Sequence, residues 1–314
     1  MTLLEVNDLT KDYGFGRGVF DVSFQVDEGE VFGFLGPNGA GKTTTIRHIM
    51  GFSRPEAGST SVDGLDSWEH AAVIQRQLGY LPGEIALPQG LTGTQFIRFM
   101  ADLRSVTDMT KTEHLLEKFD LDPTGKLKRM ALGVKRKLAI VTAFMHDPRI
   151  LVLDEPTSGL DPIMQETFID FVLEEKRLGK TILLSSHIFS EVEATCDRIA
   201  IIKEGRVVSE IVTDDLRHRQ DKVYELEFSS EEGFERFTHD DRLERYRLGL
   251  ISQHPSKRQV KIGVHDNDIN GLFSLLSDYS LKFLKEEKFT LEEYFLDFYD
   301  RDKSVAEGIA HVAH

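Results

Sequence analysis

The sequence has a single cysteine, Cys196, among its 314 residues. One thiol forms no internal disulfide and no cysteine-based zinc site, so the sequence is typical of an intracellular protein. Cys196 stands beside apolar residues in a helix-like stretch. That setting predicts a small buried side chain rather than a reactive thiol.

Long apolar runs are also missing. No stretch approaches the roughly 18 residues that a membrane-spanning helix needs. No apolar segment follows a basic N-terminus, so a secretory signal is not expected. If the protein works at a membrane, we expect another chain to supply the spanning segments.

Positive charge is scarce, since 38 Lys and Arg face 53 Asp and Glu, for a formal charge of −15. A protein that wraps nucleic acid must neutralise phosphates, so we expect no nucleic-acid partner. Hydrophobic residues make up 40% and charged residues 29%, which is typical of a folded globular chain. At about 100 to 200 residues per domain, the length favours two domains.

The first two thirds of the sequence alternate strand-like and helical patterns. The region at about 84–146 is helical in pattern, which predicts a helical subdomain. Alternating strands and helices predict an α/β core with a parallel sheet. Strands are expected at 2–7, 19–26, 30–35, 150–153, 181–184 and 199–203, and helices at 42–50 and 163–177.

A polar linker is expected at 213–222, and a second pattern follows it. The order β-α-β-β-α-β suggests a small α+β, ferredoxin-like accessory domain at 222–300. Its strands are expected at 223–228, 245–250, 259–264 and 281–287, with helices around Phe234 and Phe237 and at 269–276.

Thr290 and Glu293 predict a capping box for a closing helix. Its apolar face either packs on its own domain or meets a partner. The tail at 303–314 is expected to be mobile. The apolar face comprises Leu291, Tyr294, Phe295, Phe298 and Tyr299.

The segment GPNGAGKTT at 36–44 matches G-x-x-x-x-G-K-[ST] between a predicted strand and a predicted helix. Its glycines let backbone amides approach phosphate oxygens, and the helix N-terminus adds positive potential. Lys42 suits the β- and γ-phosphates, and the Thr43 hydroxyl suits Mg²⁺. The predicted nucleotide contacts are Gly36, Pro37, Asn38, Gly39, Ala40, Gly41, Lys42, Thr43 and Thr44.

The run ILVLDE at 150–155 delivers two carboxylates to the end of a buried strand, where α/β sheets bind ligands. Asp154 suits the role of a Mg²⁺ ligand, directly or through water. Glu155 is placed to orient or deprotonate a water that attacks the γ-phosphate.

Together with later motifs, these residues resemble the ATP-binding cassette of ABC transporters over about residues 2–215. SGLD at 158–161 resembles the family's D-loop and SSH at 185–187 its H-loop, while Tyr13 matches its adenine-stacking aromatic. The resemblance implies a P-loop NTPase core of ABC type at 1–215, with ATP and Mg²⁺ as ligands. It also implies that His187 contacts the γ-phosphate and that His187, Lys42 and Glu155 are the catalytic residues.

The resemblance further implies two cassettes that meet head to tail with ATP between them. Asp161 would communicate across that interface. Separately encoded transmembrane permease subunits would complete the transporter, placing this chain peripherally at the cytoplasmic face of the cell membrane. The second cassette is either a copy of this chain or a different chain.

Two positions depart from the family pattern. MALGV at 130–134 stands where the family has LSGGQ, so Gly133 is kept but Ala131 replaces a serine that contacts the opposing ATP. Losing a hydrogen bond to a charged group costs about 1.5 to 3 kcal/mol. Gly83 stands where the family commonly has a glutamine that helps to hold Mg²⁺, and Glu84 is a possible substitute. The adjacent Lys135, Arg136 and Lys137 are expected on a solvated face, or near the opposing nucleotide or a membrane subunit.

The resulting hypothesis is an ATPase that powers an ABC exporter of drug, antibiotic or lipid-like cargo. The C-terminal region loosely resembles the extensions of drug-exporting cassettes, which disfavours an importer. The alternative is an ATP-switched regulatory protein of ABC type with weak or no hydrolysis. Ala131 keeps that alternative open.

Overall fold

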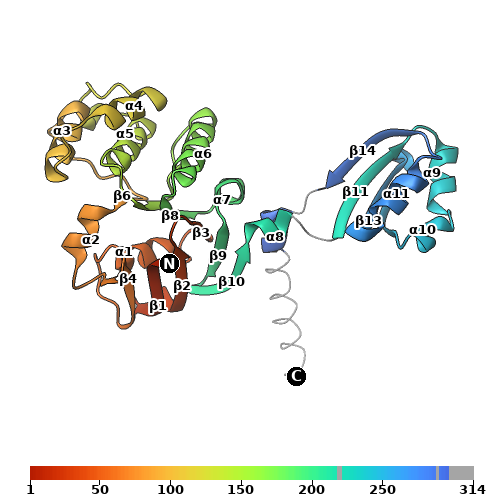
Figure 1. Cartoon of the computed structure of the whole chain (residues 1–314), viewed down its shortest axis with the longest axis horizontal. Helices are drawn as coiled ribbons and strands as arrows, with labels where there is room; N and C mark the ends of the chain where they lie inside the picture. Colours follow the sequence, from red (N-terminus) through yellow and green to blue (C-terminus); the bar gives the residue numbers. More distant parts are fainter. Residues whose placement is uncertain (218–220, 288–289, 297–314) are drawn as a thin grey trace. The chain divides into compact units, whose positions relative to one another are not determined.

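The computed structural model describes residues 1–217, 221–287 and 290–296. The chain divides into two compact units, Met1–Thr213 and Asp214–His314 (Figure 1). Within the described ranges, no helix is both long and apolar enough to cross a membrane.

The central sheet of the first unit has the order β10-β9-β3-β8-β7-β6. Five strands run parallel, and β10 pairs antiparallel with β9 at one edge. Every residue of β3, β7 and β8 is buried, which agrees with their continuous apolar sequences. The strands are β3 (Val31–Leu35), β6 (Gly79–Leu81), β7 (Ile150–Asp154), β8 (Thr181–Ser186), β9 (Arg198–Lys203) and β10 (Arg206–Val212).

A second, antiparallel sheet has the order β2-β1-β4-β5, so the expectation of one parallel sheet is incomplete. The sequence predicted β1 and β2 but not β4, whose AGSTSV sequence has few apolar residues and no regular strand signal. These strands are β1 (Thr2–Asp12), β2 (Gly18–Asp27), β4 (Ala57–Val62) and β5 (Leu65–Asp66).

Helices α3, α4 and α5 lie together in the upper part of the first unit in Figure 1, within the predicted helical region. A capping box between Thr92 and Gln95 begins α3, because each side chain satisfies the other residue's backbone N–H. The first-unit helices are α1 (Lys42–Ile49), α2 (Ala71–Gln77), α3 (Gly93–Leu103), α4 (Thr110–Lys118), η1 (Leu127–Arg129), α5 (Leu132–Phe144), α6 (Pro162–Arg177) and α7 (Phe189–Thr195).

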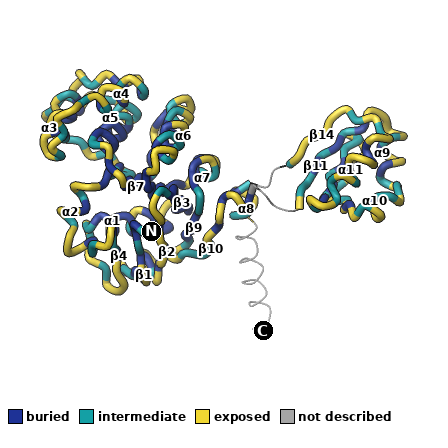
Figure 2. The backbone as a smooth tube through the Cα atoms, viewed as in Figure 1, coloured by how far each residue is buried: buried dark blue, intermediate teal, exposed yellow. Residues whose placement is uncertain are grey.

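A hydrophobic core holds α1 and both sheets together (Figure 2). Ile46 and Ile49 of α1 are fully buried in it, so the position of the helix is set by packing. At Gly33 on β3, a Cβ would lie 2.9 Å from Sγ of Cys196, which shows how closely α7 approaches the sheet. Cys196 is buried as predicted, and burial raises the pKa of its thiol to about 12.

The second unit contains an antiparallel sheet with the order β12-β13-β11-β14. Its core packs Phe228 and Phe237 at a ring-centroid distance of 4.9 Å. The elements are β11 (Asp221–Phe228), α9 (Glu231–Thr238), α10 (Arg242–Arg245), β12 (Gly249–His254), η2 (Pro255–Lys257), β13 (Gln259–His265), η3 (Asp266–Asp268), α11 (Ile269–Leu276) and β14 (Leu281–Glu287).

One strand boundary predicted for this region is wrong. The expected strand at 245–250 begins only at Gly249, because α10 and the turn after it occupy the preceding residues. The two units divide within the expected linker at 213–222. This segment contains the short helix α8 (Thr213–Arg217), whose acidic residues Asp214 and Asp215 favour a helix N-terminus.

The predicted capping box near the C-terminus is present. The Thr290 N–H donates to Glu293 at 2.8 Å, and the Glu293 N–H donates to the Thr290 hydroxyl at 3.2 Å. Phe298, Tyr299 and the tail at 303–314 lie outside the described residues.

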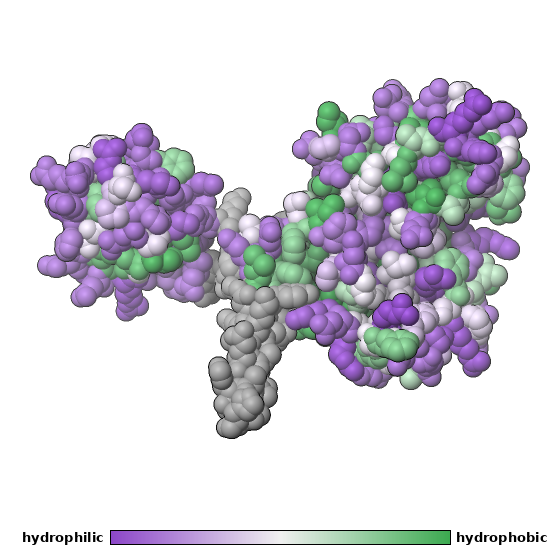
Figure 3. Space-filling model, turned by 180° about the vertical axis from the view of Figure 1, so that it is seen from behind, coloured by the Kyte–Doolittle hydropathy of each residue, from purple (hydrophilic) through white to green (hydrophobic). Residues whose placement is uncertain are grey.

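The surface of the second unit that faces the reader in Figure 3 is mostly hydrophilic, with one hydrophobic band.

Candidate functional site

The loop between β3 and α1 is shaped by glycines. Gly39 and Gly41 have φ angles of 83° and 112°, in the left-handed region that favours glycine. At Gly36 a Cβ would lie 2.4 Å from the carbonyl oxygen of Ile202, so a larger residue would displace β9. The loop therefore turns tightly and points the N-terminus of α1 at the cavity above it.

That cavity has a volume of about 650 Å³. Nine of the predicted site residues line it, and they come from the loop, from α1 and from the ends of β7 and β8. They are Asn38, Gly39, Gly41, Lys42, Thr43, Thr44, Asp154, Glu155 and His187.

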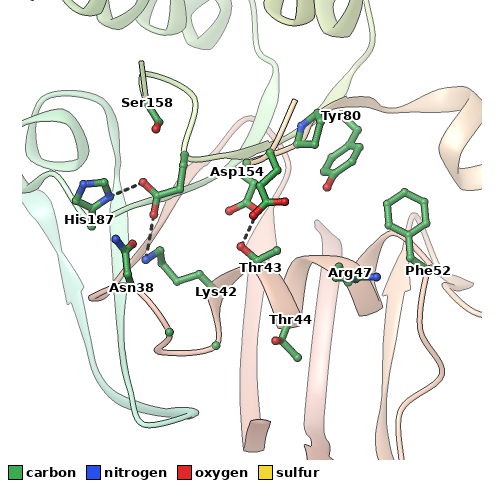
Figure 4. Close-up of a pocket in the computed structure, with 16 residues that line it drawn as sticks. Asn38, Lys42, Thr43, Thr44, Arg47, Phe52, Tyr80, Asp154, Ser158 and His187 are labelled. Atoms are coloured by element: carbon green, nitrogen blue, oxygen red, sulfur yellow. Dashed lines mark hydrogen bonds and ion pairs between the residues drawn. The ribbon is translucent and has the colours of Figure 1, made fainter. Parts of the chain in front are cut away.

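Thr43 and Asp154 form the centre of the cavity in Figure 4. The Thr43 hydroxyl donates to Oδ2 of Asp154 at 2.8 Å, and the Ser185 hydroxyl donates to Oδ1. Asp154 is fully buried, yet both of its oxygens are satisfied. A hydroxyl beside a carboxylate is a donor set that suits Mg²⁺, which takes few protein ligands and completes its shell with water and phosphate oxygens.

The Glu155 carboxylate lies between the side chains of Lys42 and His187, and dashed lines in Figure 4 mark both contacts. Its Oε1 is 3.0 Å from Nζ of Lys42, and its Oε2 is 2.5 Å from Nδ1 of His187. Glu155 also has a φ of 49°, a left-handed conformation that costs a residue with a side chain roughly 1 to 3 kcal/mol. In this conformation the carboxylate lies beside Lys42.

Lys42 is held in place by the loop itself. Its ammonium donates to the carbonyl oxygens of Gly36 at 2.6 Å and Pro37 at 3.2 Å. The side chain is 5% exposed. Its ammonium therefore faces the Glu155 carboxylate, and a bound anion would compete with Glu155 for this ammonium.

Several lining residues were not predicted. Tyr80 and Phe52 form the opposite side of the cavity from His187, and Arg47 lies one helical turn beyond Thr43 on α1. Burial and the charge of Asp154 raise the pKa of Tyr80 to about 12. The i, i+4 spacing of Thr43 and Arg47 was the available signal for Arg47. Phe52 and Tyr80 carry no motif.

Other predicted site residues do not line this cavity: Tyr13, Gly36, Pro37, Ala40, Ala131, Gly133 and Asp161. Tyr13 is 48% exposed in the turn after β1. Asp161 caps the N-terminus of α6, since its side chain accepts from the Met164 N–H at 3.0 Å. Its predicted role across an interface stays a prediction.

Ala131 is the N-cap of α5 and offers no side-chain hydrogen bond there. Gly133 lies close to the D-loop, because a Cβ on it would be 3.0 Å from the carbonyl oxygen of Gly159. The segment around Ala131 and Gly133 therefore packs on residues that directly follow the cavity wall.

The basic run after Gly133 is not the uniformly solvated face that was expected. Lys135 and Lys137 are partly exposed, whereas Arg136 is 2% exposed and donates to backbone carbonyls. The sequence alone did not distinguish these three residues, because it did not show which of them lies on the buried face of the helix.

Comparison with known proteins agrees with this geometry. Residues 19–158 match the family model described as ABC transporter. The chain is 34% identical over 235 residues to the bacitracin transport ATP-binding protein BcrA of Bacillus licheniformis, covering 73% of this chain and 76% of BcrA. It is 35% identical over 221 residues to the doxorubicin resistance ATP-binding protein DrrA of Mycobacterium tuberculosis, covering 68% and 67%.

Solved structures give the same result for the fold. An ATP-binding subunit of an ABC transporter has a TM-score of 0.63 and 35% identity, covering 68% of this chain and 92% of that one. A dimeric ATP-binding cassette with bound ADP and Pi has a TM-score of 0.61 at 22% identity, covering 67% and 99%. The chain belongs to the family of ATP-binding proteins of ABC transporters, whose cassettes are ATPases.

Proposed function

We propose that this chain hydrolyses ATP to power an ABC exporter of drug, antibiotic or lipid-like cargo. The convergence of the phosphate loop, Asp154 and Glu155 on one cavity carries this proposal. The names of BcrA and DrrA, both concerned with antibiotics or drugs, support the exporter class. These relatives do not favour the regulatory alternative.

The contacts of Glu155 with Lys42 and His187 suggest how the site responds to ATP. Lys42 and His187 both face Glu155 in this structure. An entering γ-phosphate offers them a stronger anionic partner, which frees Glu155 to accept the proton of an attacking water. Thr43 and Asp154 would hold Mg²⁺, which supplies charge neutralisation on the phosphate oxygens.

A second cassette is part of the proposal. Ala131 and Gly133 do not line the cavity of their own chain, which is compatible with a role at the ATP of an opposing cassette. Tyr13 and Asp161 are assigned in the same way, to the adenine and to communication between cassettes. In a homodimer both sites would lack the serine hydroxyl that Ala131 replaces.

A membrane subunit would dock beside the cavity. A hollow of about 290 Å³ lies where the helical subdomain meets the catalytic core, and its lining includes Ile85, Leu87, Phe96 and Met100. Phe99 and Leu103 of α3 are exposed, at 47% and 59%. This apolar surface suits a short amphipathic segment of a separately encoded permease, at the cytoplasmic face of the membrane.

We assign the domains as a cassette at 1–215, with its helical subdomain at about 84–146, and an accessory domain at 222–300. The antiparallel order β12-β13-β11-β14, with α9 and α11 between the strands, supports a ferredoxin-like topology for the accessory domain.

The proposal is tested by measuring phosphate release from ATP by the purified chain, with and without Mg²⁺, alongside equilibrium binding of ATP. We expect saturable binding and Mg²⁺-dependent release. A folded chain that binds no ATP would contradict the proposal. The exporter assignment is tested by isolating the chain with its membrane partner and assaying ATP-dependent drug efflux in vesicles, and ATP-dependent uptake of a solute by intact cells would contradict it.

A further inference from the structure

The Arg136 side chain joins three segments that are far apart in the sequence. From α5, its Nε donates to the Ser158 carbonyl at 2.9 Å, and its two terminal nitrogens donate to the carbonyls of Pro82 at 2.8 Å and Gly83 at 2.6 Å. A guanidinium presents its donors in a fixed plane, so a set of carbonyls arranged around it fixes their relative positions.

Both carbonyl-bearing segments lie beside the reacting carboxylates. The Ser158 N–H donates to the Glu155 carbonyl at 3.1 Å, so Ser158 closes the turn that begins at Glu155. A Cβ on Gly83 would lie 3.0 Å from Oδ2 of Asp154. Pro82, Gly83 and Ser158 all line the nucleotide cavity. One side chain of the helical subdomain therefore contacts the backbone next to Asp154 and next to Glu155.

The burial of Arg136 makes a solvated-charge explanation inadequate. It is 2% exposed, and no carboxylate forms an ion pair with it in the part of the chain that the structure describes. Burial lowers the pKa of Arg136, and the charges of Asp154 and Glu155 act against that shift. The hydrogen bonds to the three carbonyls further offset the cost of burying the charge. Lys135 and Lys137, its neighbours on α5, are partly exposed and have no comparable set of backbone contacts among the described residues.

We propose that Arg136 is a positioning residue for ATP hydrolysis: its three hydrogen bonds hold the Pro82–Gly83 and Ser158 backbones against α5. The inference rests on the proposed ATPase function. It adds that this guanidinium couples the orientation of the helical subdomain to the positions of Asp154 and Glu155.

Arg136→Met tests the proposal, because methionine keeps much of the aliphatic stem and removes every donor. Arg136→Lys keeps the charge but lacks the planar fork. Lys135→Met and Lys137→Met remove the same charge from the same helix and serve as controls. Each variant is purified as the full chain and assayed for kcat, KM and ATP dissociation constant, with the thermal midpoint as a check on folding.

We expect kcat to fall at least about tenfold in Arg136→Met, the size of one lost hydrogen bond from a charged donor. Arg136→Lys should recover little of it. The ATP dissociation constant should change less than about threefold, because the phosphate loop is untouched. The two lysine controls should lose much less kcat than Arg136→Met. A wild-type kcat in Arg136→Met, or parallel losses of ATP binding and thermal midpoint, would overturn the positioning role.

A second readout separates this inference from the proposed function. Amide hydrogen exchange should increase in peptides covering 82–86 and 156–160 in Arg136→Met, and stay unchanged at 36–44. This comparison needs no turnover, so it holds even if the wild-type chain alone releases no phosphate. Unchanged exchange in both segments, relative to Lys135→Met, would refute the link that we assign to Arg136.

Discussion

Replacing Gly83 by alanine should disturb Asp154, although only one methyl group is added. The new Cβ would lie 3.0 Å from Oδ2 and 3.3 Å from Cγ of Asp154. Asp154 has little room to yield, because Thr43 and Ser185 bind its two oxygens. Gly83 is itself held by Arg136 at 2.6 Å. We therefore expect a shift of a few tenths of an ångström in the Thr43–Asp154 pair, by the scale of ordinary packing adjustments.

The magnitude follows from the hydrogen bond at risk. A bond to a charged acceptor contributes about 1.5 to 3 kcal/mol, which corresponds to about 10- to 100-fold in rate if the transition state feels all of it. We expect the Mg²⁺ concentration for half-maximal ATP turnover to rise by about tenfold in Gly83→Ala, with ATP affinity in the absence of Mg²⁺ unchanged.

The assay is phosphate release at saturating ATP over a Mg²⁺ titration. Gly90→Ala is the matched control, because a Cβ there would meet nothing within 4 Å and the residue belongs to the same connecting segment. If Gly83→Ala and Gly90→Ala gave the same Mg²⁺ dependence as wild type, the close approach of Gly83 to Asp154 would have no functional meaning.

Three further predictions concern other parts of the chain. Ala131→Ser should raise ATP turnover by up to about tenfold. It should also raise the thermal midpoint, because Ala131 is the N-cap of α5 and makes no side-chain hydrogen bond there. A higher midpoint with unchanged turnover would contradict a role for the serine hydroxyl in hydrolysis. Burial raises the pKa of Glu191 to about 7 from 4.5. The folded chain therefore binds this proton more tightly than the unfolded chain, and the free energy of unfolding should fall as pH rises from about 4.5 to about 7. The thermal midpoint should fall less steeply across that window in Glu191→Gln than in wild type, and equal slopes would contradict the assignment. Phe237→Ala removes a fully buried ring that contacts Phe228 and Tyr279. It should lower the free energy of unfolding of the second unit by about 3 to 5 kcal/mol. Calorimetry should then show the second unit unfolding first, and a single unchanged transition would refute independent folding of the two units.

The sequence predicted the chemistry of the site better than its surroundings. Lys42, Thr43, Asp154 and Glu155 belong to motifs in which residue type and spacing follow from phosphate binding, so their convergence was predictable. Arg136 and Tyr80 were not, because their roles depend on which face of a helix or strand meets another segment. The same holds for β4 and α10, whose short polar sequences are fixed by their neighbours rather than by their own propensity.

The departures from the family pattern acquire a physical meaning only in the structure. Gly83 lacks a side chain, and the space that one would need is occupied by Asp154. Ala131 lacks a hydroxyl and does not line the chain's own cavity. We therefore expect the first difference to affect the site within this chain, and we propose that the second affects an opposing nucleotide.

The central claim is that Glu155, released from Lys42 and His187 by ATP, activates the attacking water. The measurement is ATP turnover and ATP binding by Glu155→Gln, with Glu69→Gln as a control for the loss of one exposed carboxylate. We predict that turnover falls about 10²- to 10⁴-fold in Glu155→Gln, the usual contribution of a general base, while ATP binds at least as tightly because Lys42 loses its competing partner. Turnover at the wild-type rate in Glu155→Gln would contradict the account.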